Sequence, residues 1–117
     1  MPNFMLLLHE QPMDHSQFSA EEMQAVIAEY VAWRQKVEAD GKFVSAEKLK
    51  DEGGRHLVHT DDGLRVTDGP YAEAAEVIGG YFTISADSYD DAVATAAECP
   101  HLKFGGRIEL REVEPTG

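Results

Sequence analysis

The stretch at residues 68–82 constrains the fold of this chain more than any other part of the sequence. It begins with an Asp-Gly-Pro turn, continues through a short acidic connection, and ends with Gly79 and Gly80 leading into an apolar run. Asp, Gly and Pro favour turns through side-chain hydrogen bonding, freedom of φ and a fixed φ, respectively. This stretch therefore predicts a rigid turn, a short link and a strand, with the two glycines either allowing a ligand close to the backbone or marking a bulge.

The chain is long enough for one domain. It has 117 residues, of which 43% are hydrophobic, so we treat residues 1–117 as a single domain with an ordinary core. The apolar run at residues 4–8 is too short for a signal peptide or a membrane span. The single cysteine, Cys99, can form no internal disulfide, so we expect a cytoplasmic protein.

The charge balance narrows the classes of partner. Twenty-two acidic and 10 basic residues give a formal net charge of −12, and the basic residues form no cluster. We expect neither nucleic acid nor an anionic membrane as a partner, because both repel such a surface. The sequence has no dinucleotide or phosphate-cradling motif, and His56 and His59 would point to opposite faces of a strand. We therefore expect no cofactor and no bound metal.

Local patterns predict seven segments. The apolar run at residues 4–8 predicts a strand with apolar side chains on both faces. Ser19 and Glu22 match a capping box that begins a long helix, and Gly41 ends it. The remaining segments are strands at 43–49, 81–86 and 107–113, a hairpin of 55–60 and 64–68, and a short helix capped by Ser88 and closed by Pro100.

The two helices have apolar faces of different kinds. Apolar residues of the long helix recur at helical spacing: Met23, Val26, Ile27, Tyr30, Val31 and Val37. The short helix has a face of small side chains and should lie close to the sheet: Ala92, Val93, Ala96 and Ala97.

The order of elements predicts an α+β fold. A split β-α-β layout, with the helices on one face of an antiparallel sheet, accounts for this order. Two helices cannot cover both faces, yet the strand at residues 4–8 is apolar on both. We therefore expect a homodimer in which a second copy covers the open face around a twofold axis.

Several motifs occur in order along nearly the whole chain: Asp68-Gly69-Pro70-Tyr71, Gly79-Gly80-Tyr81, Cys99-Pro100-His101 and Gly105-Gly106. With these motifs the chain resembles the YCII-related family, and within it the DGPF-type subgroup, whose Phe is replaced here by Tyr71. The resemblance implies a ferredoxin-like fold that dimerises as an α+β barrel.

The resemblance also implies a small-molecule function. In the wider family a His and an Asp in a cleft look like a catalytic pair, and one relative looks like a dehydrochlorinase acting on an aromatic ring. Better-understood enzymes of the superfamily act on small cyclic substrates such as lactones. The long helix of this chain contains no His, so the pair that the motifs supply is His101 and Asp68.

His101 and Asp68 are our candidate catalytic residues. A His held by a carboxylate can act as a general base near neutral pH. Both residues also have structural alternatives. His101 can interact with the carbonyl end of the short helix, and Asp68 can accept hydrogen bonds within its own turn.

A second set of residues is a candidate for binding a small organic ligand. Arg34 lies within the apolar stripe of the long helix. There it either meets a carboxylate, of the protein (such as Asp68) or of a ligand, or extends its charged end to solvent. Tyr71, Tyr81 and Tyr30 are candidates to line the cavity and offer hydroxyl donors, with core packing as the favoured role for Tyr30. The full set is Tyr71, Tyr81, Arg34, Gly69, Pro70, Gly79 and Gly80.

Two functional hypotheses follow. The first is a cofactor-independent lyase or isomerase, in which His101 moves a proton on a small organic substrate and Asp68 orients the imidazole. The second is a non-catalytic module that binds a small ligand or a regulatory partner, since some relatives resemble companions of sigma-factor-like regulators. A closed cavity with His101 and a carboxylate near a common point would favour the enzyme.

Overall fold

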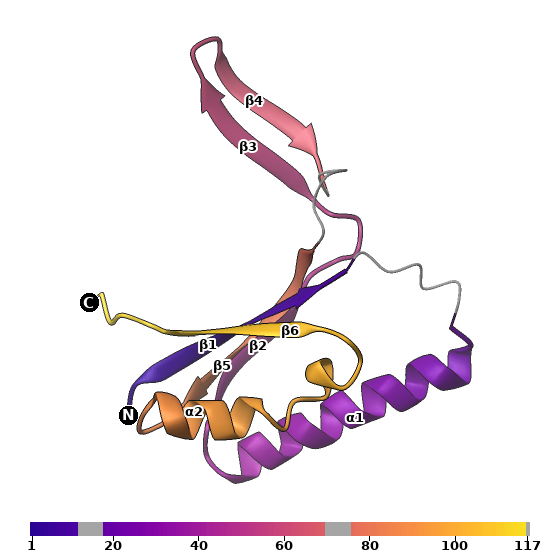
Figure 1. The fold of residues 1–117 in the computed structure, drawn as a ribbon, viewed down its shortest axis with the longest axis vertical. Coiled ribbons are helices and arrows are strands. Elements are labelled where there is room, and N and C mark those ends of the chain that lie inside the picture. The colour runs from indigo at the N-terminus through magenta and orange to yellow at the C-terminus, as the bar shows by residue number, and fades with distance from the viewer. Residues whose placement is uncertain (12–17, 70–75, 117) are drawn as a thin grey trace.

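The computed structural model describes residues 1–11, 18–69 and 76–116. All of the predicted elements are present, with one additional short 3-10 helix, η2 (Figure 1). In chain order they are β1 (Asn3–Glu10), α1 (Ala20–Ala39), β2 (Phe43–Lys48), β3 (Arg55–Thr60), β4 (Gly63–Asp68), β5 (Val77–Ser85), α2 (Tyr89–Ala96), η2 (Pro100–Leu102) and β6 (Arg107–Glu112).

The main sheet confirms the split β-α-β prediction. Its four strands lie in the order β2-β5-β1-β6, and all neighbours are antiparallel. β5 separates β1 from β2, and β1 separates β5 from β6, so each helix connects two strands that are not neighbours. β5 begins earlier than predicted, and its register against β1 shifts between Leu8 and His9, opposite Gly79. The glycine pair therefore lies at a β-bulge inside the strand, which was one of its two predicted roles.

The core lies between one face of the sheet and the two helices. Phe4, Leu6 and Leu8 of β1 are buried, whereas Met5 and Leu7 on the opposite face are only partly covered. The indole of Trp33 meets the ring of Phe82 edge-on, with centroids 4.9 Å apart. Other core residues are Val37, Ile84, Ala86, Ala92, Ala96 and Cys99.

Helix α1 begins and ends as predicted but packs over a shorter length. Ser19 and Glu22 form the reciprocal capping box, and Gly41 has a φ of 72°. Only Trp33 and Val37 of this helix are buried, while Ile27 is 55% exposed. The N-terminal end of α1 extends away from the strands (Figure 1), so most of the predicted apolar stripe does not reach the core.

Helix α2 buries a narrower face than predicted. Ser88 caps it, and Ala92 and Ala96 are buried. Val93 is 54% exposed, however, and Ala97 is exposed as well. A helix of this length touches the sheet along a single row of positions four apart, which excludes its neighbours on the helical surface. Among the described residues, neither helix has both the length and the apolar character to span a bilayer.

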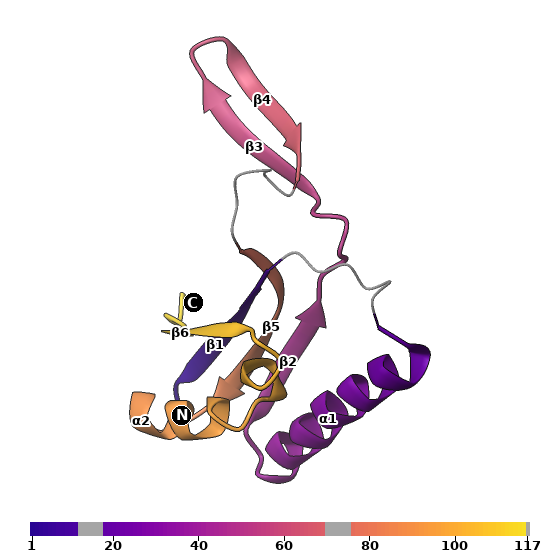
Figure 2. The ribbon, with the colours of Figure 1, turned by 45° about the vertical axis from the view of Figure 1, so that its right-hand side comes forward.

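Strands β3 and β4 form a hairpin that projects from the main sheet (Figures 1 and 2). Their register places Leu57 opposite Val66 and His59 opposite Leu64, so the three apolar side chains share one face. Leu57 and Leu64 are each 63% exposed. The projection gives a radius of gyration of 16.4 Å, against about 13 Å for a compact domain of this length.

Candidate functional site

A cavity of about 850 Å³ lies between α1 and the sheet. It exists because the N-terminal part of α1 does not pack against the strands, so the apolar stripe of the helix forms one wall. The volume falls within the usual range for small-molecule sites. Apolar side chains that line it include Leu8, Phe18, Met23, Val26, Ile27, Val31 and Phe82.

His101 and Tyr30 form a hydrogen-bonded pair in the wall of this cavity. His101 belongs to η2, and only 4% of the residue is exposed. The Nε2 of His101 lies 2.8 Å from the backbone carbonyl oxygen of His9, and Nδ1 lies 3.1 Å from the hydroxyl of Tyr30. A carbonyl can only accept, so Nε2 donates to His9, and Tyr30 donates to Nδ1 of the neutral ring. A Cβ at Gly106 would collide with the imidazole, so this position needs glycine.

Tyr30 keeps its proton at physiological pH. Burial raises its pKa to about 12, and Cys99 and Glu10 add smaller contributions in the same direction. The residue contacts the core, which was its favoured role, and it also lines the cavity, which was the alternative. Burial likewise raises the pKa of the Cys99 thiol, which agrees with its expected packing role.

The structure does not bring Asp68 to His101. Asp68 ends β4 on the projecting hairpin, its side chain is 84% exposed, and its carboxylate pairs with Nε of Arg55 at 3.1 Å. Within the described parts of the chain, the hydrogen-bond partners of the imidazole are the His9 carbonyl of β1 and the Tyr30 hydroxyl, and neither a carboxylate nor the carbonyl end of α2. The neighbouring Gly69 donates its N–H to the Gly54 carbonyl oxygen, which closes the base of the hairpin.

Arg34 lines the cavity and meets a carboxylate of the protein, although that carboxylate is not Asp68. Its Nε donates to Glu38 at 2.8 Å, one helical turn away, and its guanidinium lies 4.4 Å from the centroid of the Phe43 ring. The side chain is 48% exposed, which matches the predicted alternative of a charged end that extends to solvent.

The remaining predicted binding residues divide into two groups. Gly79, Gly80 and Tyr81 line the cavity together with Arg34 and His101. Pro70 and Tyr71 lie outside the described residues.

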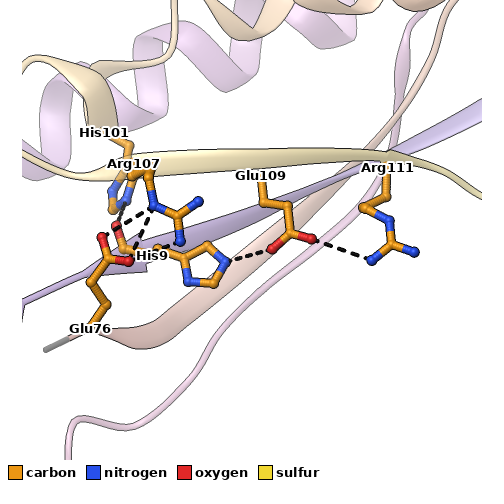
Figure 3. A network of polar contacts seen from close by, with 6 residues as sticks. All are labelled: His9, Glu76, His101, Arg107, Glu109 and Arg111. Atoms are coloured by element: carbon orange, nitrogen blue, oxygen red, sulfur yellow. Dashed lines mark hydrogen bonds and ion pairs between the residues drawn. The ribbon is translucent and has the colours of Figure 1, made fainter. Parts of the chain in front are cut away.

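A row of ion pairs covers the β6 side of the opposite sheet face (Figure 3). Nε2 of His9 lies 2.9 Å from Glu109, whose other oxygen pairs with Arg111 at 3.3 Å. Arg107 binds Glu76 at 2.9 Å. The hydrogen bond with His9, and then the one from Arg111, hold the pKa of Glu109 below its usual value. His9 therefore contacts Glu109 with its side chain and His101 with its carbonyl group.

Sequence reasoning favoured core packing for Tyr30 and did not select His9 or Glu109. His9 and Glu109 are 100 positions apart, and only the pairing of β1 with β6 brings them together. One signal was present, because the alternation in β6 turns Glu109 away from the core side chains Ile108 and Leu110. Across residues 1–11, 18–69 and 76–116, no three His, Cys, Asp or Glu side chains are arranged to hold a metal ion.

Comparison with known proteins agrees with the topology. A family model described as the YCII-related domain matches residues 3–116. A search of curated proteins finds no match to the chain. Since the family model spans nearly the whole sequence and the observed strand order fits the fold expected from the motifs, the chain belongs to the YCII-related family.

Proposed function

We propose that this protein binds a small organic molecule in the cavity between α1 and the sheet, and that it moves a proton on that molecule as a cofactor-independent lyase or isomerase. The observation that supports this most is the hydrogen-bonded pair Tyr30 and His101 in a cavity whose walls are largely apolar. Apolar walls with a few convergent polar groups are the usual design of a small-molecule site.

The hydrogen-bond directions define the proton path. A substrate proton moves to the hydroxyl oxygen of Tyr30 as the hydroxyl proton moves to Nδ1 of His101. The resulting imidazolium keeps its Nε2–H donated to the carbonyl oxygen of His9, which stabilises the positive charge. Return of the proton to another atom of the substrate completes an isomerisation, and loss of a leaving group completes an elimination. Asp68 takes no part in this path, because its carboxylate lies on the hairpin and pairs with Arg55.

The second candidate is a module that binds the same kind of ligand, or a regulatory partner, without chemistry. One observation favours it: both ring nitrogens of His101 already have hydrogen-bond partners, and only 4% of the residue is exposed. A histidine with a purely structural role would have the same hydrogen bonds and the same burial.

Hydrogen–deuterium exchange separates the two candidates without knowledge of the natural reaction. Cyclic hydroxyketones and hydroxylactones, which carry an O–H donor as well as acidic C–H groups, are incubated with the protein in deuterium oxide, and loss of the C–H signal is followed by proton NMR. The enzyme predicts exchange above the buffer rate that falls at least about 100-fold in Tyr30→Phe and in His101→Phe. Ligand binding without accelerated exchange would contradict the enzyme and support the non-catalytic module.

We further propose that the protein is a homodimer that forms the α+β barrel of a DGPF-type member, and that it is cytoplasmic. Two exposed surfaces support the dimer. The open sheet face carries Met5 and Leu7 at its centre with ion pairs along one edge, an arrangement typical of interfaces. The hairpin presents Leu57, Leu64 and Val66 to solvent, although an isolated hairpin is only marginally stable in water. The buried free thiol of Cys99 suits the cytoplasm.

Light scattering after size exclusion tests the dimer. The wild type should have twice the protomer mass at micromolar concentration. Leu57→Asp should weaken association by at least tenfold, because it places a charge on the apolar face of the hairpin. Val58→Asp, on the opposite face of the same strand, is the matched control and should associate as the wild type does. A wild-type monomer at that concentration would refute the proposal.

A further inference from the structure

The hydrogen-bond chain that ends at Tyr30 has a fixed direction. It begins at the carbonyl oxygen of His9, which has no hydrogen to donate, so Nε2 of His101 must carry a proton. In the neutral ring Nδ1 is then an acceptor, and the hydroxyl of Tyr30, 3.1 Å away, must give its hydrogen to it. The oxygen of Tyr30 is left with lone pairs only.

The hydroxyl of Tyr30 does not ionise near neutral pH, since its pKa is raised to about 12, so it keeps donating to His101. Rotation of the hydroxyl toward a ligand would leave two acceptors, Nδ1 and the ligand atom, in competition for one hydrogen. Breaking the existing hydrogen bond to a buried imidazole carries a penalty that a donor ligand avoids.

The charged groups around the cavity also favour a neutral ligand. Among the residues that the structure describes, the cations that line the cavity are already paired, Arg34 with Glu38 at 2.8 Å and Lys48 with Asp51 at 3.1 Å. Glu10 and Glu47 also line the cavity, and neither has a cation within ion-pair distance among the described residues. An anionic ligand would therefore meet uncompensated negative charge.

We propose that the cavity selects a neutral molecule with an apolar body whose buried polar group is an O–H or N–H donor. Ligands whose polar group only accepts, and carboxylates above all, are disfavoured. This inference rests on the proposed function only in that the cavity binds a small molecule. It does not depend on whether chemistry follows.

Three probes with the same apolar body test the selectivity: 4-tert-butylcyclohexanol, 4-tert-butylcyclohexanone and 4-tert-butylcyclohexanecarboxylate. Affinities are measured by isothermal titration calorimetry at about pH 8, above the usual pKa of histidine. The alcohol should bind roughly tenfold more tightly than the ketone, which is the size of one hydrogen bond in such a site, and the carboxylate should bind more weakly than either.

Two variants connect the selectivity to the hydrogen-bond chain. Tyr30→Phe removes the acceptor, so the preference for the alcohol over the ketone should fall to about one while both still bind. His101→Leu frees the Tyr30 hydroxyl to donate, so the ketone should gain affinity. Tyr89→Phe is the control, because it makes the same chemical change on α2, where the hydroxyl accepts from the N–H of Glu112.

The outcomes separate this inference from the proposed function. Equal or tighter binding of the ketone or the carboxylate to the wild type overturns the inference and leaves the binding function standing. Unchanged selectivity in Tyr30→Phe overturns the inference as well. This variant should keep the wild-type fold, because it deletes only one oxygen atom. Failure of all three probes to bind counts against the proposed function, and the inference falls with it.

Discussion

Two substitutions in α1 test whether the cavity is open as the structure describes. Trp33 is 5% exposed and Ile27 is 55% exposed, although both are large apolar residues on the same helix. Truncating a buried Trp to Ala typically costs about 3–5 kcal/mol, so we expect Trp33→Ala to lose that much free energy of unfolding. The indole also donates to the Thr95 carbonyl at 3.3 Å, which places the cost at the upper end.

Ile27→Ala removes about three methylene equivalents, worth roughly 2.4 kcal/mol if fully buried at about 0.8 kcal/mol each. Just under half of the residue is buried, and the open side leaves no new cavity, so we expect a loss of about 1 kcal/mol.

Urea denaturation at a fixed protomer concentration measures both values. With a slope of about 1.5 kcal/mol per molar urea, the midpoint should fall by roughly 2–3 M for Trp33→Ala and by about 0.7 M for Ile27→Ala. Trp33→Phe, which keeps a ring against Phe82, provides an intermediate value if the alanine variant does not fold. A loss for Ile27→Ala as large as that for Trp33→Ala would refute the reasoning, because α1 would then pack against the sheet along its whole length.

Three further predictions concern the polar groups. Tyr30→Phe should lower the free energy of unfolding by about 1 kcal/mol near neutral pH, because it removes one hydrogen bond. Since the pKa of Tyr30 is raised to about 12 in the folded state, the wild type should also lose stability as the pH rises from about 10 to 12. Chemical denaturation should show this alkaline loss in the wild type and not in the variant. Glu109→Gln should remove a stabilisation that is present above the usual carboxyl pKa and lost as the pH falls through the lowered one, so acid should shift the urea midpoint less in the variant than in the wild type. Gly106→Ala should lose about 1–3 kcal/mol of free energy of unfolding, because the new Cβ meets the His101 ring. Gly79→Ala should lose less, because its Cβ meets only the flexible end of Glu10. Equal thermal stability of these two variants would contradict this prediction.

Local sequence signals accounted for the elements, and pairing rules accounted for their order. The capping box at Ser19 and the left-handed Gly41 depend on residues close in sequence, so they were readable. The length of α1 that packs against the sheet could not be predicted in this way. Helical spacing shows which side chains share a face, and it does not show whether that face contacts the sheet. Ile27 follows the same spacing as Val37, yet one lines a cavity and the other lies in the core.

The candidate site shows the same division. His101 was selected from its motif, and it does line the cavity. Its partners were missed, because a backbone carbonyl at His9 leaves no mark on the sequence and the contact with Tyr30 joins residues 71 positions apart. Asp68 was chosen as the start of a turn, and in the structure it is the last residue of β4, at the base of a hairpin whose direction no local pattern specifies.

The protonation of the His101 ring tests the central claim most directly. Long-range nitrogen–proton correlation NMR on uniformly nitrogen-15-labelled protein distinguishes a protonated ring nitrogen from an unprotonated one. The structure predicts a single neutral tautomer at about pH 8, with the proton on Nε2 and with Nδ1 as the acceptor for Tyr30. A proton on Nδ1, or an average of the two tautomers such as a solvent-exposed histidine shows, would contradict the account.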